Sequence, residues 1–102
     1  MPDLSQSTLN ILTMAKRAGR LVPGFDSVKE EIIAKKAACV YITSDISEKT
    51  KKEIIFYSDK YEIPCLELDI TMNDTEHCFR KRVGVFSTGD EGFAKAIKKL
   101  YV

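Results

Sequence analysis

The segment CVYIT, residues Cys39–Thr43, is the feature that most restricts the fold, because it is a nearly unbroken run of apolar and β-branched residues. Such a run is typical of a strand that is buried on both faces of a sheet. Three other short segments also read as strands, and segments with helical spacing of apolar residues separate all four. This alternation predicts the α/β class, with a central, largely parallel sheet covered by helices on both faces.

Turn and capping residues between the apolar segments set the expected bounds of each element. Strands are expected at residues 20–22, 39–43, 65–68 and 82–87, and helices at about 5–19, 26–35, 47–61, 71–81 and 90–100. The expected N-terminal caps of the helices are, in order, Ser5 or Ser7, Asp26 or Ser27, Ser47, Thr71 or Asn73, and Asp90, with Glu76 completing a capping box if Asn73 is the cap.

The same spacing predicts which side chains are buried. Val28, Ile32 and Ile33 form the expected inner face of the second helix. The expected buried residues of the sheet are Val40, Ile42, Leu66 and Val85, with Cys39 or Cys65 among them.

Length and composition indicate one globular domain spanning residues 1–102. Hydrophobic residues make up 44% of the chain and charged residues 30%, which is ordinary for a folded protein. No apolar run reaches the ~20 residues that a membrane span requires, and the first residues lack the pattern of a secretory signal. The chain has three cysteines, an odd number with no C-x-x-C pair, which favours a reducing compartment, so we expect a cytoplasmic protein.

No constellation of side chains in the sequence indicates catalysis or metal binding. His77 and Cys78 are adjacent on a predicted helix and point about 100° apart, so they do not form a dyad. One histidine and three scattered cysteines lack the spaced pairs of a zinc site. The segment GDEG at residues 89–92 is shorter than a phosphate-binding loop and has no lysine. We therefore expect no enzymatic activity, no cofactor and no metal.

Local basic clusters are the remaining candidates for a binding surface. The formal net charge is only +1, with 16 Lys and Arg against 15 Asp and Glu, so bulk charge does not indicate nucleic acid. Clusters occur at Lys16/Arg17/Arg20, at Arg80–Arg82 and at Lys95/Lys98/Lys99. The first two stand at helix ends, where cations also stabilise the helix dipole, and the third fits a solvated helix face. Three consecutive cations at residues 80–82 exceed what capping requires.

Three stretches carry a resemblance to a known family: LNILTMAKRAGRLVPG, SDISEKTKK and VGVFSTGDEGFAKAI. Together they resemble the family of kink-turn-binding ribosomal proteins, in the right order and over nearly the whole chain. The resemblance implies a three-layer α/β/α sandwich with a mixed four-stranded sheet. It also implies an RNA surface formed by the loop between the first strand and the second helix and by the loop that leads into the fourth helix.

The family's readout motif, Gly-x-Asn-Glu-x-x-Lys, is only partly present. Gly24 matches the glycine, whereas Asp26, Ser27 and Glu30 replace the Asn, Glu and Lys that contact the kinked RNA. The scaffold is thus kept while the readers are changed, and Arg20 keeps a family cation. The expected RNA-binding residues are Lys16, Arg17, Arg20, Gly24, Phe25, Asp26, Ser27, Glu30, Ile70, Thr71, Met72, Arg80, Lys81 and Arg82.

The resemblance implies an RNA-binding protein of the ribosome or translation apparatus. We expect it to bind structured RNA, either ribosomal or kink-turn-like, mainly through backbone contacts, with degenerate kink-turn readout. The partners expected are this RNA and a ribosomal or translation protein, and the chain is expected to be a monomer. The alternative is a protein-interaction module that kept the fold and lost RNA binding, with its acidic Asp26/Glu30/Glu31 patch facing a basic partner.

Overall fold

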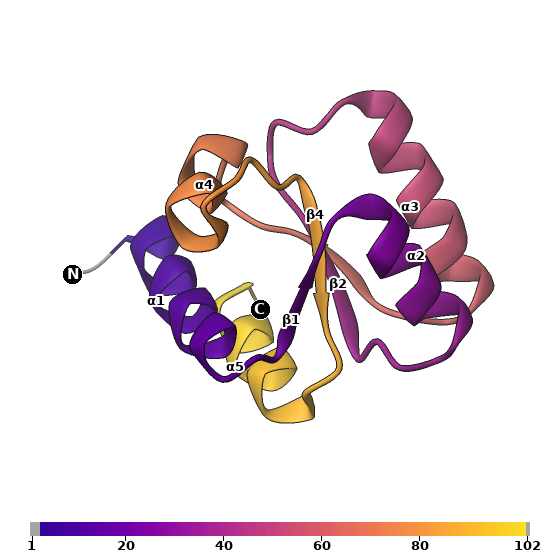
Figure 1. The fold of residues 1–102 in the computed structure, drawn as a ribbon, viewed down its shortest axis with the longest axis horizontal. Helices are drawn as coiled ribbons and strands as arrows, with labels where there is room; N and C mark the ends of the chain where they lie inside the picture. Colours follow the sequence, from indigo (N-terminus) through magenta and orange to yellow (C-terminus); the bar gives the residue numbers. More distant parts are fainter. Residues whose placement is uncertain (1–2, 102) are drawn as a thin grey trace.

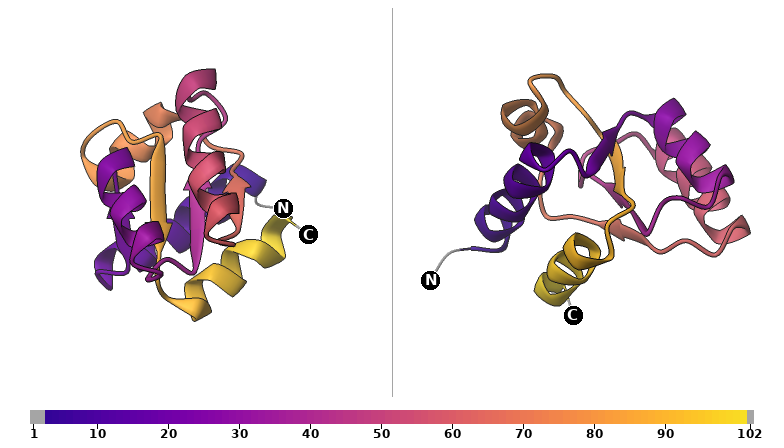
Figure 2. Two further views of the ribbon diagram at one scale, coloured as in Figure 1. Left: turned by 90° about the vertical axis from the view of Figure 1, so that its right-hand side faces the viewer. Right: turned by 60° about the horizontal axis from the view of Figure 1, so that its bottom comes forward.

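The computed structural model describes residues 3–101, which form a four-stranded sheet between two layers of helices (Figure 1). Helices α2 and α3 cover one face of the sheet, and α1, α4 and α5 cover the other (Figures 1 and 2). Within the described residues the elements are α1 (Leu4–Arg17), β1 (Leu21–Pro23), α2 (Phe25–Ile33), β2 (Cys39–Ile42), α3 (Glu48–Lys60), β3 (Cys65–Glu67), α4 (Met72–Phe79), β4 (Val85–Thr88) and α5 (Glu91–Tyr101). The three-layer sandwich implied by the resemblance is confirmed.

The sheet is mixed rather than largely parallel. Its strand order is β1-β4-β2-β3; β4 runs antiparallel to both of its neighbours, and only β2 and β3 are parallel. The expectation of a largely parallel sheet was therefore wrong, and the mixed sheet implied by the resemblance is confirmed. The reason lies in α4, because the chain enters and leaves this helix at the end of the sheet where β2 and β3 finish. The chain consequently enters β4 at Val85, beside Ile42, and runs back along β2.

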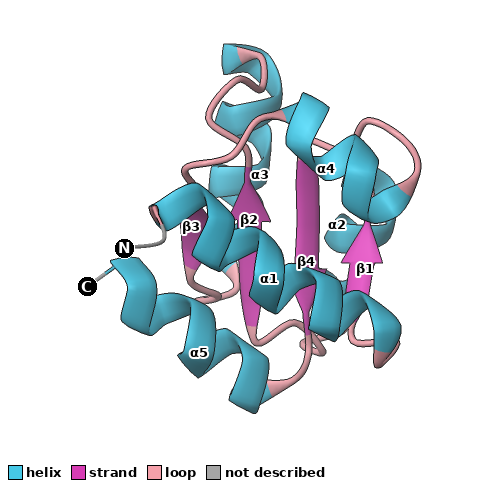
Figure 3. Cartoon of the chain, turned by 90° about the vertical axis from the view of Figure 1, so that its left-hand side faces the viewer, coloured by secondary structure: helices cyan, strands magenta, loops and turns pink. Residues whose placement is uncertain are grey.

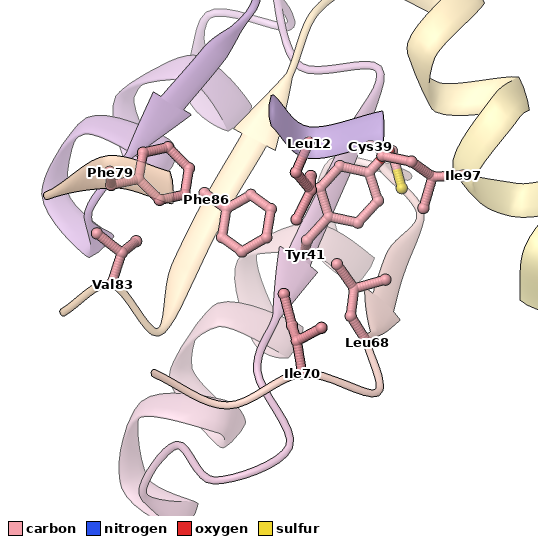
Figure 4. Packing of buried hydrophobic residues seen from close by; sticks show 9 residues of the cluster. All are labelled: Leu12, Cys39, Tyr41, Leu68, Ile70, Phe79, Val83, Phe86 and Ile97. Atoms are coloured by element: carbon pink, nitrogen blue, oxygen red, sulfur yellow. The ribbon is translucent and has the colours of Figure 1, made fainter. Parts of the chain in front are cut away.

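Two apolar clusters form the core, one on each face of the sheet. On the α1, α4 and α5 side, nine buried residues pack together (Figure 4), with Tyr41 and Phe86 at 5.5 Å between ring centroids. On the α2 and α3 side, the cluster contains Val28, Ile32, Ala37, Val40, Ile42, Ile54 and Val85. Cys39, Val40, Ile42 and Val85 are buried as the sequence predicts.

Two predicted core residues lie nearer the surface. Leu66 is only half-buried, because β3 is an edge strand with a neighbour on one side. Ile33 is 46% exposed, since it is the last residue of α2 and its side chain is outside the inner face that Val28 and Ile32 form.

The helix caps partly follow the sequence prediction. Ser47 caps α3, and the Phe93 N–H donates to Asp90 Oδ1 at 3.0 Å at the start of α5. Asp3 rather than Ser5 or Ser7 caps α1, because that helix begins earlier than its apolar spacing suggests. Thr71, one of the two predicted caps, caps α4 and forms a capping box with Asp74; the box with Glu76, predicted for Asn73 as the cap, does not form.

Helix α2 has no side-chain cap. Gly24 is its N-cap residue, so Asp26 and Ser27 lie inside the helix, contrary to the prediction.

Candidate nucleic-acid interface

Three loops meet at the end of the sheet where β1 and β2 finish and β4 begins, and they enclose a groove of about 420 Å³. One loop joins β1 to α2, the second joins β2 to α3, and the third joins α4 to β4; the start of α4 closes the groove. We call this hollow the loop groove. Its lining residues are Gly24, Phe25, Ile46, Ser47, Thr50, Met72, Lys81, Arg82, Val83, Gly84 and Val85.

Two glycines allow the loops to approach one another. Gly24 has a φ of +97°, a backbone conformation that residues with a side chain rarely adopt, and its N–H donates to the Val85 carbonyl at 2.8 Å. Gly84 faces the floor of the groove, where an added Cβ atom would lie 2.5 Å from Ile46 Cγ2 and 3.3 Å from Met72 Sδ. The width of the loop groove therefore depends on the absence of a side chain at Gly84.

Hydrogen bonds hold the loop after β2 against the start of α4. The Met72 N–H donates to Asp45 Oδ1 at 3.0 Å, and the Ser44 N–H donates to the Ile70 carbonyl at 2.9 Å. The Thr71 N–H donates to Asp74 Oδ2 at 2.9 Å in the capping box. These bonds fix Met72 at the groove, where its half-buried thioether forms part of the apolar floor.

Thr75 anchors the loop that carries the basic cluster of residues 80–82. Its side chain is fully buried, and its hydroxyl accepts the Val83 N–H at 3.1 Å and donates to the Val83 carbonyl at 2.7 Å. A single hydroxyl thus satisfies both backbone groups of a buried loop residue. The spacing of apolar residues gave no signal for this role, because a threonine inside an amphipathic helix is usually solvated.

The basic cluster divides at the rim of the groove. All three cations are exposed, but only Lys81 and Arg82 line the loop groove. Arg80 lies outside the lining and ends α4 in the left-handed conformation, with a φ of +61°. Arg82 Nη1 lies 4.0 Å from Glu76 Oε2, and both side chains are about half exposed. A contact of that length between exposed groups contributes little, so the guanidinium remains able to contact an anion.

The cluster at the end of α1 lies elsewhere in the molecule. Because Leu21 pairs with Thr88 and Pro23 with Phe86, the residues before β1 and those after it stand at opposite ends of the sheet. Arg20 accordingly lies beside the turn that follows β4, with its Nε 3.8 Å from Asp90 Oδ2. The structure does not bring Arg20 together with Gly24, although the sequence analysis assigned both to one RNA surface.

Lys16 and Arg17, the other cations of this cluster, are exposed in the last turn of α1. Helix α1 packs against α4, and the positive charge of Lys16 opposes the rise in the pKa of Cys78 that burial causes.

The changed readers lie on α2 beside the loop groove rather than in it. Asp26, Ser27 and Glu30 are all exposed, and none of them is among the residues that line the groove. Asp26 and Glu30 are one turn apart and share a helix face. Their carboxylates add negative charge next to the groove, at the helix end where Gly24 and Phe25 enter it.

The second predicted loop contributes one of its three residues to the groove. Met72 lines it, and Thr71 caps α4. Ile70 is only 1% exposed and packs in the core (Figure 4), so its side chain is not available to contact an extruded base, contrary to the prediction.

Sequence reasoning missed Ile46 and Ser47 of the loop after β2, and Val83 and Gly84 of the loop before β4, although it identified Lys81 and Arg82 of that second loop. A signal for two of them was present, since Ile46 is an apolar residue in the polar loop SDIS and Gly84 interrupts the apolar segment VGVF.

The ionisable side chains give no indication of reactivity. Burial raises the pKa of Cys39 and of Cys78, and it raises the pKa of Cys65 to about 11, so these thiols stay protonated near neutral pH. His77 is exposed. Within residues 3–101 no group of three or more His, Cys, Asp or Glu side chains is arranged to hold a metal ion.

A mixed four-stranded sheet between two helical layers, with a basic-rimmed groove formed by loops at one end, defines a class of small α/β binding domains. The model of the Ribosomal protein L7Ae/L30e/S12e/Gadd45 family matches residues 6–97, and the chain belongs to this family. It is 38% identical to RNA-binding protein YlxQ of Enterococcus faecium over 95 residues, which cover 93% of this chain and 91% of that protein. Membership of this family confirms the expectation that the chain is not an enzyme.

Solved structures with low sequence identity share the fold. A protein with unknown function from Bacillus halodurans superposes with a TM-score of 0.83 at 24% identity, covering 91% of this chain and 94% of that chain. The Giardia lamblia 15.5kD RNA binding protein superposes with a TM-score of 0.76 at 14% identity, covering 98% of this chain and 86% of that chain. None of the helices within residues 3–101 combines the length and the apolar character needed to span a bilayer.

Proposed function

We propose that this protein binds structured RNA of the ribosome or translation apparatus, as a cytoplasmic monomer, through the loop groove and its basic rim. The observation that carries the proposal is that one groove combines Gly24 and Phe25, Met72, and the cations Lys81 and Arg82. The membership of the chain in its family and the name of a relative, RNA-binding protein YlxQ, support the same function.

The chemistry of the groove favours contacts with the RNA backbone. Lys81 and Arg82 are positioned to neutralise phosphates, which supply most of the affinity of sequence-independent binding. The apolar floor suits the face of a base or a sugar. Asp26 and Glu30 instead place carboxylates where the family resemblance implies an amide and a cation that contact a kinked RNA. We therefore expect weak discrimination between a kink-turn and a regular duplex.

The test is a titration of the full chain against a kink-turn RNA and an unkinked RNA duplex of equal length, over a range of salt concentrations. Replacing both Lys81 and Arg82 with Ala should weaken binding to both RNAs and lower the salt slope by up to about 2, because each lost phosphate contact removes about 0.9. Lys95→Ala/Lys98→Ala is the matched control, since these two exposed lysines lie on α5 and are not among the residues that line the loop groove.

Unchanged binding in the Lys81/Arg82 variant would remove the loop groove from the RNA surface. Failure of the native protein to bind either RNA at low salt would refute RNA binding itself and favour the protein-interaction alternative.

A second variant tests the changed readers directly. Asp26→Asn, Ser27→Glu and Glu30→Lys together should raise affinity for the kink-turn RNA by about 100-fold over the native protein, from two restored contacts of ~1–3 kcal/mol each. The unkinked duplex serves as the control and should gain only the general effect of the added positive charge. If the native protein already prefers the kink-turn strongly, Asp26, Ser27 and Glu30 form a working variant reader, and our expectation of weak discrimination is wrong.

A further inference from the structure

A second groove lies at the opposite end of the sheet, between β3, the start of β2 and α5. Its volume is about 270 Å³, and Cys39, Pro64, Leu66 and Ala94 give it an apolar lining. We call it the α5 groove. Cys39, which lines the α5 groove, pairs with Thr88 at one end of β4. Val85, which lines the loop groove, is at the other end of β4, so the length of the sheet separates the two grooves.

The α5 groove adjoins the open edge of the sheet. The strand order places β3 at this edge, with β2 as its neighbour on one side, and Figure 3 shows β3 at the margin of the sheet. Leu66, in the middle of β3, is half-buried and lines the groove. The outer side of an edge strand presents backbone N–H and C=O groups to which a further extended chain can bond.

The rim of the α5 groove is predominantly positive. Lys95 and Lys98 are exposed, lie one turn apart on the same face of α5, and line the groove. Neither forms an ion pair with a carboxylate of residues 3–101. Within residues 3–101, Glu91 is the only acidic residue that lines the α5 groove. An apolar floor beside two unpaired ammonium groups complements a ligand that is apolar at its centre and acidic at its flank.

We propose that the α5 groove docks an extended segment of a protein partner. The segment lies along the open edge of β3, inserts one apolar side chain between Leu66 and Ala94, and places acidic side chains against Lys95 and Lys98. An RNA fits this surface less well, because the lining is mainly apolar and Glu91 would repel a phosphate. The proposal goes beyond RNA binding and does not depend on it. Since the sheet separates the two grooves, one molecule can hold an RNA and a protein segment together.

The experiment selects nine-residue peptides from a randomised displayed library against the full chain. Enriched peptides should combine an apolar residue with neighbouring Asp or Glu, and one synthesised peptide should bind with micromolar affinity. Lys95→Glu/Lys98→Glu should weaken that peptide at least tenfold. Lys49→Glu/Lys52→Glu is the matched control, because it reverses two exposed lysines at the same spacing on α3. Both variants change only exposed side chains, and circular dichroism verifies that each is folded.

Backbone pairing is tested by N-methylation of the selected peptide. Methylation of the alternate amide nitrogens that face β3 should abolish binding of the peptide. Methylation of the intervening amide nitrogens, which face away from β3, should leave binding nearly unchanged. The proposal is overturned if no peptide is enriched, if the selected peptides lack acidic residues, or if the Lys95/Lys98 and Lys49/Lys52 variants weaken binding equally. It is also overturned if a single-stranded RNA probe in the same assay loses more affinity in the Lys95/Lys98 variant than the peptide does.

Discussion

Replacing Thr75 with Val removes one buried hydroxyl and leaves the shape of the side chain nearly unchanged. In the native protein that hydroxyl accepts the Val83 N–H at 3.1 Å and donates to the Val83 carbonyl at 2.7 Å. Valine can form neither bond, and Val83, only 4% exposed, has little access to water that would replace them.

The expected loss of stability follows from these two groups. Each hydrogen bond contributes about 1 kcal/mol net, and a buried N–H left without a partner costs about 1–3 kcal/mol. The burial of an additional methyl group offsets part of this cost. We therefore expect Thr75→Val to lower the free energy of unfolding by about 2–3 kcal/mol. Thr75→Ser retains the hydroxyl and should lose about 1 kcal/mol, for the deleted methyl group.

Urea denaturation followed by circular dichroism measures both losses, provided that the slope with denaturant stays constant. Thr13→Val is the control, because Thr13 is an exposed residue of α1 whose hydroxyl donates to the Leu9 carbonyl at 2.8 Å. Its stability should change by no more than about 0.5 kcal/mol. A loss for Thr75→Val as small as that of the control would mean that the hydroxyl does not hold the loop. Titration with RNA well below the melting temperature should also show weaker binding, since the same loop carries Lys81 and Arg82.

Three further predictions concern the core, the loop groove and the thiols. Ile42→Ala should lower the free energy of unfolding by ~2–5 kcal/mol through the cavity left at a side chain that is 2% exposed; a loss under ~1 kcal/mol in urea denaturation would contradict this. Gly84→Ala should cost ~1–3 kcal/mol and weaken RNA binding, because the new Cβ lies 2.5 Å from Ile46 Cγ2; undiminished affinity would show that the groove can widen. Because the pKa of Cys65 is raised to about 11, iodoacetamide should alkylate this thiol at pH 8 on the order of 100-fold more slowly than a free thiol, and the rate should increase up to pH 10. Mass spectrometry measures the alkylation, and reaction at the rate of a free thiol would refute the raised pKa.

The sequence predicts local structure well where a cap and an apolar period agree. Helix α3 follows Ser47 and ends at Lys60, as expected, because a capping serine, inward-facing residues and a following proline all indicate the same bounds. Strand β2 is buried as its composition requires. The direction of β4 could not be predicted from the alternation, since no residue of α4 indicates whether that helix crosses the sheet or stays at one end.

The candidate site was predictable only in part, for a related reason. Gly24 and Met72 were identified from the family resemblance, and Lys81 and Arg82 from their density of charge. Arg20 has the same kind of charge, yet β1 carries the chain from one end of the sheet to the other between Arg20 and Gly24. Because Arg20 and Gly24 are close in sequence, they were assigned to one surface, but β1 places them at opposite ends of the sheet.

The position of β4 between β1 and β2 constrains how the chain can fold during its synthesis. β1 is made early, but its partner in the sheet comprises residues Val85–Thr88, near the other end of the chain. Until those residues leave the ribosome, β1 has no strand to pair with, and one edge of β2 stays open. Long-range pairing of this kind slows folding and leaves strand edges exposed. A nascent chain that stops before Val85 should therefore remain unfolded and be a substrate for chaperones, and α5, which follows β4 in the chain, emerges later still.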